Sequence, residues 1–187
     1  SAGAFSLTEA VIAQSIRLTR QAYPDDLIIV FPHWGYNYKW QTKGQQGFAR
    51  LMIDSGADLI MGHSSHMFQG IERYKGKWII YSLGNFVFNS SGRFDKLNAP
   101  PFSLVGLLTL TTDDQTKTIQ LRLYPIQSNN LRTRFQPRPL NLLEITKATR
   151  LLEQHSVGWS TDSDNVKTGA DAGGYYFEMD VSNVSVP

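Results

Sequence analysis

The stretch "DDLIIVFPHWGY" (residues 25–36) carries a continuous apolar run that ends in a proline, a histidine and a glycine. A second stretch, "ADLIMGHSSHMFQG" (residues 57–70), repeats this order: a shorter apolar run leads into a glycine and two histidines three positions apart. Between them, "GQQGFARLMIDSG" (residues 44–56) has apolar side chains at helical spacing and ends at a glycine, which favours a helix C-terminus. Strand, helix and strand at these lengths predict a βαβ unit whose first strand is buried on both faces.

The rest of the chain predicts a helix before this unit and hairpins after it. "SLTEAVIAQSIRLTRQA" (residues 6–22) has Ser6 and Glu9 at capping-box spacing and apolar residues on one face. The strand signals that follow are "GIERY", "WIIYSL", "FSLVGLLTLTT" and "TIQLRLYPI", separated by turn residues. A last helix begins at Asn141, before a polar, glycine-rich segment and a short strand "YYFEMDV". We therefore predict an α/β fold in which antiparallel hairpins follow a βαβ unit.

Composition limits the classes of protein to which the chain can belong. Its 187 residues, 41% of them hydrophobic, suffice for one domain or part of one. No apolar run approaches the ~20 residues that span a bilayer. Lys and Arg are spread along a chain of net charge +2, which does not indicate nucleic-acid binding, and "RTRFQPRP" (residues 132–139) is typical of a solvated connection. Because the chain has no cysteine, any metal must be held by nitrogen and oxygen ligands.

Three of the four histidines follow apolar strands. In α/β sheets, ligand sites gather at the carboxyl ends of strands, and neighbouring strands lie ~5 Å apart. The loops that carry His33, His63 and His66 should therefore meet, and three imidazoles can begin a divalent-metal site. A histidine can also simply hydrogen-bond within its loop, but three histidines at matching strand ends favour the metal.

A hydrolytic two-metal centre also needs carboxylates that neutralise and bridge the ions. Asp25, Asp26 and Asp58 precede their strands and should lie at the opposite edge of the sheet from the histidines. Glu72 and Asp95 fall in the right region of the sequence, which does not fix their positions. No general acid or other catalytic residue is assigned.

The loop "HWGYNYKW" (residues 33–40) alternates four aromatic residues, Trp34, Tyr36, Tyr38 and Trp40. Alternating aromatic side chains suit the binding of a polymer chain, including a sugar. As an equal alternative, they form a local hydrophobic cover over the end of the sheet.

Several motifs in a fixed order carry a family resemblance: His-Trp-Gly, the helix around "FARLM", Gly-Ala-Asp, Gly-His-x-x-His, "GIERY" and "YSLGNF". Over about residues 27–88 they resemble the carboxyl-terminal half of the bacterial capsule-synthesis CapA family, also called poly-γ-glutamate biosynthesis proteins. That family is in turn similar to the calcineurin-like metallophosphoesterases, which pack two mixed sheets between helices and carry a two-metal site at strand ends.

The resemblance implies half of an α/β/β/α sandwich over residues 1–140, followed by the closing helix, glycine-rich segment and terminal strand of residues 141–187. It implies that the metal ligands are His33, His63 and His66. It also implies that four neighbours orient ligands or bind substrate: Trp34, Tyr36, Asn37 and Asn85. The metal would be Mn, Zn or Fe, as one ion or as two in the full-length protein.

The chain departs from the family pattern at two points. Family members often carry Glu where this chain has Asn37, so a charge near the site is missing. Their first half also supplies an early Gly-Asp motif and an Asn-Asn or Asn-His motif, neither of which occurs in the first half of this chain. The resemblance therefore implies an amino-terminal half upstream of Ser1.

Two functions of different classes stay open from the sequence. As an enzyme, the full-length protein would be a metal-dependent, phosphoesterase-like hydrolase whose metal activates a water molecule. As a non-catalytic envelope module, the same cleft would bind an anionic or sugar-containing polymer, or hold capsule-synthase components together. We expect a place in the bacterial cell envelope or on its outer face, reached through a segment not present here. An unpaired sheet edge would also favour a homodimer.

Overall fold

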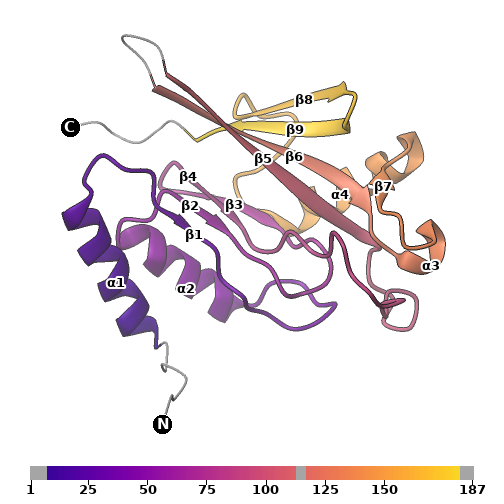
Figure 1. Ribbon diagram of the computed structural model, residues 1–187, viewed down its shortest axis with the longest axis horizontal. Coiled ribbons are helices and arrows are strands. Elements are labelled where there is room, and N and C mark those ends of the chain that lie inside the picture. Colours follow the sequence, from indigo (N-terminus) through magenta and orange to yellow (C-terminus); the bar gives the residue numbers. More distant parts are fainter. Residues whose placement is uncertain (1–7, 113–116, 182–187) are drawn as a thin grey trace.

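The computed structural model describes residues 8–112 and 117–181, which form two sheets with helices packed against them (Figure 1). The strands of the first sheet, in spatial order, are β1 (Ile29–Val30), β2 (Leu59–Met61), β4 (Lys77–Ile80) and β3 (Ile71–Tyr74). β1, β2 and β4 run parallel, and β3 pairs antiparallel with β4. The parallel pairing of β1 with β2, joined through α2 (Lys43–Asp54), confirms the predicted βαβ unit.

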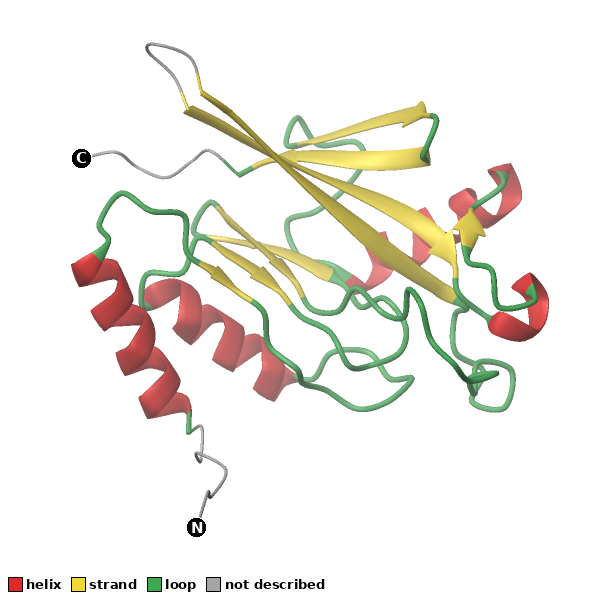
Figure 2. Cartoon of the chain, in the orientation of Figure 1, coloured by secondary structure: helices red, strands yellow, loops and turns green. Residues whose placement is uncertain are grey.

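The second sheet is antiparallel and lies across the first (Figure 2). Its strands, in spatial order, are β5 (Phe102–Thr112), β6 (Lys117–Gln127), β9 (Gly174–Asp180) and β8 (Val166–Asp171), while β7 (Arg138–Pro139) pairs with β6. The predicted hairpins are thus present. The segment that we expected to be only polar and glycine-rich forms a full strand, β8, because six of its residues pair with β9 in a continuous register.

Each long helix begins at a side chain that accepts hydrogen bonds from free backbone N–H groups. α1 (Glu9–Ala22) starts after Thr8, whose Oγ1 accepts from the Val11 N–H at 3.3 Å; the predicted Ser6 cap lies outside the described residues. α2 has a capping box formed by Thr42 and Gln45. The predicted capping box of α4 (Leu142–His155) is confirmed at Asn141, and a short helix, α3 (Asn130–Thr133), precedes it. No helix in the described part of the chain combines the length and apolar character that a membrane crossing requires.

Two apolar cores hold the layers together. The smaller core lies between helices α1 and α2 and one face of the first sheet, with residues such as Ile16, Met52 and Ile60. The larger core lies between the other face of that sheet, the second sheet and α4, with residues such as Trp78 and Leu121. The first sheet is therefore a central layer, covered by helices on one face and by a sheet on the other (Figure 1).

The prediction that the first strand is buried on both faces is wrong. β1 lies at the edge of its sheet, where Ile29 is 40% exposed and the following Phe31 is 57% exposed. Within residues 8–112 and 117–181, no strand pairs with the outer side of β1. An apolar run in sequence indicates how much burial a segment can use, but not how many neighbours it has.

Candidate functional site

The two histidine loops meet, as the strand positions predicted. His33 and His63 form a parallel β-bridge just beyond β1 and β2. The His63 N–H donates to the Pro32 carbonyl at 3.0 Å, and the Trp34 N–H donates to the His63 carbonyl at 3.1 Å. The two imidazoles lie edge to face with ring centroids 4.7 Å apart. The parallel ladder therefore continues past the strands and holds two imidazoles side by side at the carboxyl edge of the sheet.

This close approach depends on a glycine. Trp34 lies under the loop and its indole Nε1–H donates to the Tyr81 carbonyl at 2.7 Å. A Cβ atom on Gly62 would lie 2.2 Å from that carbonyl oxygen and 2.4 Å from Trp34 Nε1. Neither group can move without breaking the sheet or its hydrogen bond. Only glycine therefore fits between the second histidine loop and β4.

The backbone between the two histidines of this loop adopts an uncommon conformation. Ser64 has φ 105° and His66 has φ 64°, values in the left-handed region that non-glycine residues rarely adopt. Ser65 is fully buried, and its hydroxyl donates to the Met67 carbonyl at 2.7 Å. Its carbonyl accepts from the Tyr38 N–H at 2.7 Å. Strain held in this way often marks functional loops.

His66 is oriented by three neighbours. Its Nδ1 lies 2.9 Å from Asn85 Oδ1. Its ring stacks on the ring of Tyr38, with centroids 5.1 Å apart, and lies tilted against the ring of Phe88, with centroids 4.9 Å apart. An amide oxygen can only accept a hydrogen bond, so this contact places the imidazole proton on Nδ1. The other ring nitrogen, Nε2, then carries the lone pair that a metal or a substrate proton would use.

His63 is held in the uncharged form that binds metals. Burial lowers its pKa, and the neighbouring His33 lowers it further because two imidazolium charges repel each other. Phe31 also contacts the ring, with centroids 4.8 Å apart. At neutral pH His63 therefore offers a neutral imidazole to a cation, with the His33 ring beside it.

The carboxylates do not complete a metal centre around these histidines. Asp58 lies at the opposite edge of the sheet, as predicted, where Lys77 Nζ lies 2.9 Å away and the Ile28 N–H donates to it at 2.9 Å. Glu72 is buried, and it accepts from Arg50 at 2.8 Å and from the Tyr81 hydroxyl at 2.6 Å. Asp95 is exposed and pairs with a surface arginine.

Among the described residues, no three His, Cys, Asp or Glu side chains stand close enough together to hold a metal ion. The donor set therefore fits a metal in part. His33 and His63 are adjacent nitrogen donors, but among the described residues neither His66, which lies on the same loop as His63, nor a carboxylate stands close enough to form a group of three ligands with them.

The four aromatic residues of the first histidine loop mostly have structural partners. Trp34 donates to the carbonyl of Tyr81, the residue after β4. Tyr38 is 6% exposed between His66 and Phe94, and Trp40 stacks on His155 with ring centroids 3.6 Å apart. Only Tyr36, at 70%, is widely exposed among these four. The hydrophobic-cover interpretation therefore holds for three of them. Asn37 is exposed in the same loop.

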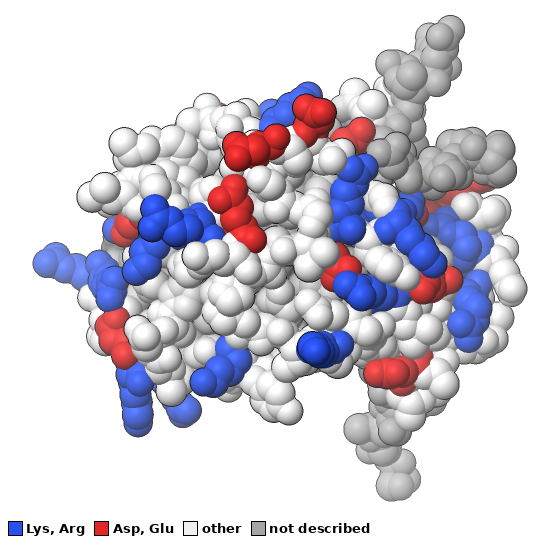
Figure 3. Space-filling view, turned by 180° about the vertical axis from the view of Figure 1, so that it is seen from behind, with Lys and Arg blue, Asp and Glu red and all other residues white. Residues whose placement is uncertain are grey.

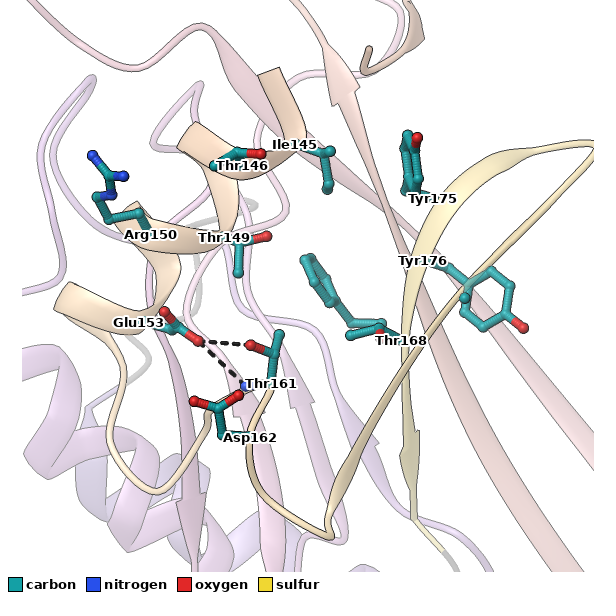
Figure 4. A pocket seen from close by; sticks show the side chains of 12 residues that line it. Ile145, Thr146, Thr149, Arg150, Glu153, Thr161, Asp162, Thr168, Tyr175 and Tyr176 are labelled. Carbon is teal, nitrogen blue, oxygen red and sulfur yellow. Dashed lines mark hydrogen bonds between the residues drawn. The ribbon is translucent and has the colours of Figure 1, made fainter. Parts of the chain in front are cut away.

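A cavity of about 530 Å³ lies away from the histidines, between α4 and the β8–β9 hairpin (Figure 4). Threonines, tyrosines and apolar side chains line it, with Glu153 accepting from the Thr161 hydroxyl at 2.8 Å. Its lining comes from residues 145–177, where the sequence carries no recognisable motif. Sequence reasoning missed it because a cavity between packed elements has no local signal.

Comparison with known proteins decides the family. Residues 2–90 match PGA_cap, the bacterial capsule synthesis protein family. The chain belongs to this family. It is 46% identical over 65 residues to the capsule biosynthesis protein CapA of Bacillus anthracis, a segment covering 34% of the chain and 16% of that relative. It is 48% identical over 65 residues to the PGA biosynthesis protein CapA of Bacillus subtilis, covering 34% of the chain and 17% of the relative.

A longer match is to a probable polyglutamine synthesis accessory protein of Mycobacterium tuberculosis. It is 31% identical over 153 residues, which cover 68% of the chain and 40% of that protein. The chain thus spans less than half the length of each of these relatives. Both histidine loops and Asn85 fall within the segment that matches the family.

Proposed function

We propose that the chain is the carboxyl-terminal part of a protein of capsule or poly-γ-glutamate biosynthesis. Its histidine edge, formed by His33, His63 and His66 beyond β1 and β2, would supply nitrogen ligands to a divalent metal site. The observation that carries this proposal is the contact of His33 with His63 beyond two adjacent parallel strands. Membership of the capsule synthesis family supports the biosynthetic role.

In this site His33 and His63 would be ligands of Mn, Zn or Fe, and His66, which does not stand close enough to form a group of three with them in the structure, would join them in the full-length protein. A bound divalent ion would supply Lewis-acid chemistry and a more acidic water molecule. The protein's own contribution is orientation and protonation state: burial keeps His63 neutral, and Asn85 Oδ1 fixes the proton of His66 on Nδ1. Tyr36 and Asn37, both exposed in the first histidine loop, stand where a substrate would approach.

The remaining ligands, in this proposal, come from another part of a longer protein. The site lacks a carboxylate among the described residues, and the adjacent edge strand β1 exposes Ile29 and the neighbouring Phe31. A further strand added at this edge would cover both side chains and bring new donors to the histidines. Residues 1–140 would then be half of a metallophosphoesterase-like α/β/β/α sandwich, with residues 141–187 closing it. The same open edge would allow a second copy of the chain to pair instead.

We place the whole protein in the bacterial cell envelope or on its outer face, where it would act on an anionic or sugar-containing polymer beside the capsule synthase components. The names of its relatives, a capsule biosynthesis protein and a PGA biosynthesis protein, support this assignment. The activity would be that of a phosphoesterase-like or amide-cleaving hydrolase.

A second candidate is a non-catalytic module that binds the polymer or scaffolds the synthase. The lack of a carboxylate at the histidine edge within the described residues favours it, because metal-assisted hydrolysis usually needs an acidic ligand or base.

Calorimetric titration of the purified chain with Mn²⁺, Zn²⁺ and Fe²⁺ tests the metal assignment. We expect stoichiometric binding that the His63→Ala variant loses and the His155→Ala variant keeps, since His155 stacks on Trp40 outside the proposed site. Equal binding by both variants would contradict the assignment. Release of product from a phosphodiester or γ-glutamyl peptide by the metal-loaded chain would support the hydrolase, and intact substrate with normal metal binding would support the module.

A further inference from the structure

Five exposed basic side chains follow one another across one face of the molecule, and we call them the basic strip: Arg93, Lys96, Arg132, Lys147 and Arg150. Two cavities connect its members. One, of about 120 Å³, is lined by Arg93 and Lys96; the other, of about 320 Å³, is lined by Arg132 and Lys147. Lys147 and Arg150 are three residues apart on α4 and therefore neighbours on its surface. The strip is thus continuous from the loop after β4, past α3, to α4.

This face is strongly positive for a chain that is nearly neutral. Asp95 lines both cavities and is the one carboxylate that pairs with the strip among the described residues. With Glu153, which lies three residues from Arg150 on α4 and lines the same cavity, five basic groups and two acids give +3, against +2 for the whole chain. Several basic side chains lie at the edge of the molecule where α3 and α4 are, with acidic side chains among them, and others are spread over the rest of this face (Figure 3). Arg93, Lys96, Lys147 and Arg150 have no ion-pair partner within the described part of the chain.

The guanidinium groups of this face already hold carboxylates in the folded protein. Arg132 Nη2 lies 2.7 Å from Asp95 Oδ1. Beside the strip, Arg138 contacts the two carboxylate oxygens of Glu144 at 2.7 and 2.8 Å and lowers the pKa of Glu144 to about 2. Guanidinium groups match carboxylates with paired, directional hydrogen bonds. The face can therefore bind carboxylates through directional hydrogen bonds as well as through electrostatic attraction.

The strip ends beside the histidine edge. Phe94, between Arg93 and Asp95, is buried and packs edge-on against Tyr38 with ring centroids 5.1 Å apart. Tyr38 in turn stacks on His66. At the other end Arg150, which is also one of the residues that line the large cavity, extends from α4 on the side away from Tyr175 and Thr168 (Figure 4). A chain laid along the strip would run from α4 to the histidines.

We propose that the basic strip binds an extended polycarboxylate chain and leads it to the histidine edge. The identity of the polymer as a γ-linked glutamate chain rests on the proposed function, whereas the binding itself follows from the charges and contacts of the strip. Each glutamyl residue carries one carboxylate, and binding would release counterions from the polymer, so affinity falls as salt rises.

Fluorescence anisotropy with a labelled γ-linked glutamate oligomer of about ten residues tests the proposal on the full chain. We expect the double variant Lys147→Gln, Arg150→Gln to bind about tenfold more weakly, or ~1.4 kcal/mol. Its affinity should also depend less steeply on salt. The matched control Lys75→Gln, Lys167→Gln removes the same charge from the β3–β4 turn and from β8, and should bind like the unmodified chain.

Equal binding by the two double variants would overturn the proposal, and so would a single-stranded DNA of equal charge that binds as tightly as the oligomer. The His63→Ala variant separates this proposal from the metal site. If this variant loses metal binding but still binds the oligomer, the result supports oligomer binding by the basic strip, independently of the metal assignment. Oligomer binding that requires His63 rather than Lys147 and Arg150 would contradict the strip.

Discussion

Gly62 is the residue on which the meeting of the histidine loops depends. Replacing it with alanine places a Cβ atom 2.2 Å from the Tyr81 carbonyl oxygen. We expect the Gly62→Ala variant to lose ~1–3 kcal/mol of unfolding free energy through overpacking. Gly47→Ala is the control: nothing lies within 4 Å of its new Cβ, and it falls inside α2, so alanine should stabilise by about 0.5–1 kcal/mol. Urea denaturation measures both, and equal values for the two variants would contradict the account.

Asn85 acts on the proposed metal through His66. Truncation in Asn85→Ala removes the acceptor that fixes the proton on His66 Nδ1, and such outer contacts typically contribute about 10–100-fold to metal affinity. We therefore expect weaker zinc binding by calorimetry with a nearly unchanged melting temperature. Asn89→Ala makes the same chemical change at an exposed position four residues on. If both variants bind zinc equally, Asn85 does not position His66.

At the scale of elements, an ion pair between the partly exposed Arg50 and the buried Glu72 ties α2 to β3, and the hydroxyl of Tyr81, the residue after β4, joins it. Glu72, 1% exposed, accepts from Arg50 and from the Tyr81 hydroxyl. Burial raises the pKa of Tyr81, and the hydrogen bond to Glu72 raises it further, so the hydroxyl stays protonated. Tyr81→Phe leaves the carboxylate under-satisfied and should cost ~1–3 kcal/mol. Tyr74→Phe, which removes an exposed hydroxyl bonded to Asp54, should cost less than about 0.5 kcal/mol. A reversed order would exclude the network as a main stabilising contact.

The first histidine loop is tied to α4 by the stack of Trp40 on His155. Burial lowers the pKa of His155 below its ordinary value of 6.5. Because the folded-state pKa is the lower one, this contribution to stability is present above pH 6.5 and is lost as the pH falls through the folded-state pKa. An NMR titration of the imidazole should give a pKa below 6.5, and Trp40→Leu should raise it. A pKa at or above 6.5 in the unmodified chain would show that the stack does not bury the ring.

The sequence predicted those elements whose signals are local. The capping box at Asn141 and the helix stop at Gly56 rest on short-range patterns, and the meeting of the two histidine loops follows from the βαβ order of those elements. The prediction that the first strand is buried on both faces was wrong, because an apolar run does not show how many strands will pair with it. The strand β8 was missed because its polar, glycine-containing sequence becomes a strand only through pairing with β9. The basic strip was also missed, since its members are up to 57 positions apart, from Arg93 to Arg150, and meet only in three dimensions.

At the scale of the whole molecule, the chain is a layered α/β protein with three histidines beyond the carboxyl ends of β1 and β2 in the central sheet. β1, the outer strand of that sheet, exposes Ile29, and Phe31 after it is also exposed. The basic strip approaches the histidines through Phe94 and Tyr38. The histidine nitrogens, the unpaired side of β1 and the basic strip therefore lie on one side of the protein. This convergence, together with membership of the capsule synthesis family, is the basis for assigning polymer chemistry to that side.

X-ray absorption spectroscopy of the zinc-loaded chain tests whether the histidines bind the metal. We expect a first shell with two to three imidazole nitrogens at ~2.0–2.1 Å, together with the outer-shell scattering of imidazole rings. The number of imidazoles should fall in the His63→Ala variant and stay the same in His155→Ala. A shell of oxygen ligands alone, or a spectrum that His63→Ala leaves unchanged, would contradict the claim that this edge of the sheet is a metal site.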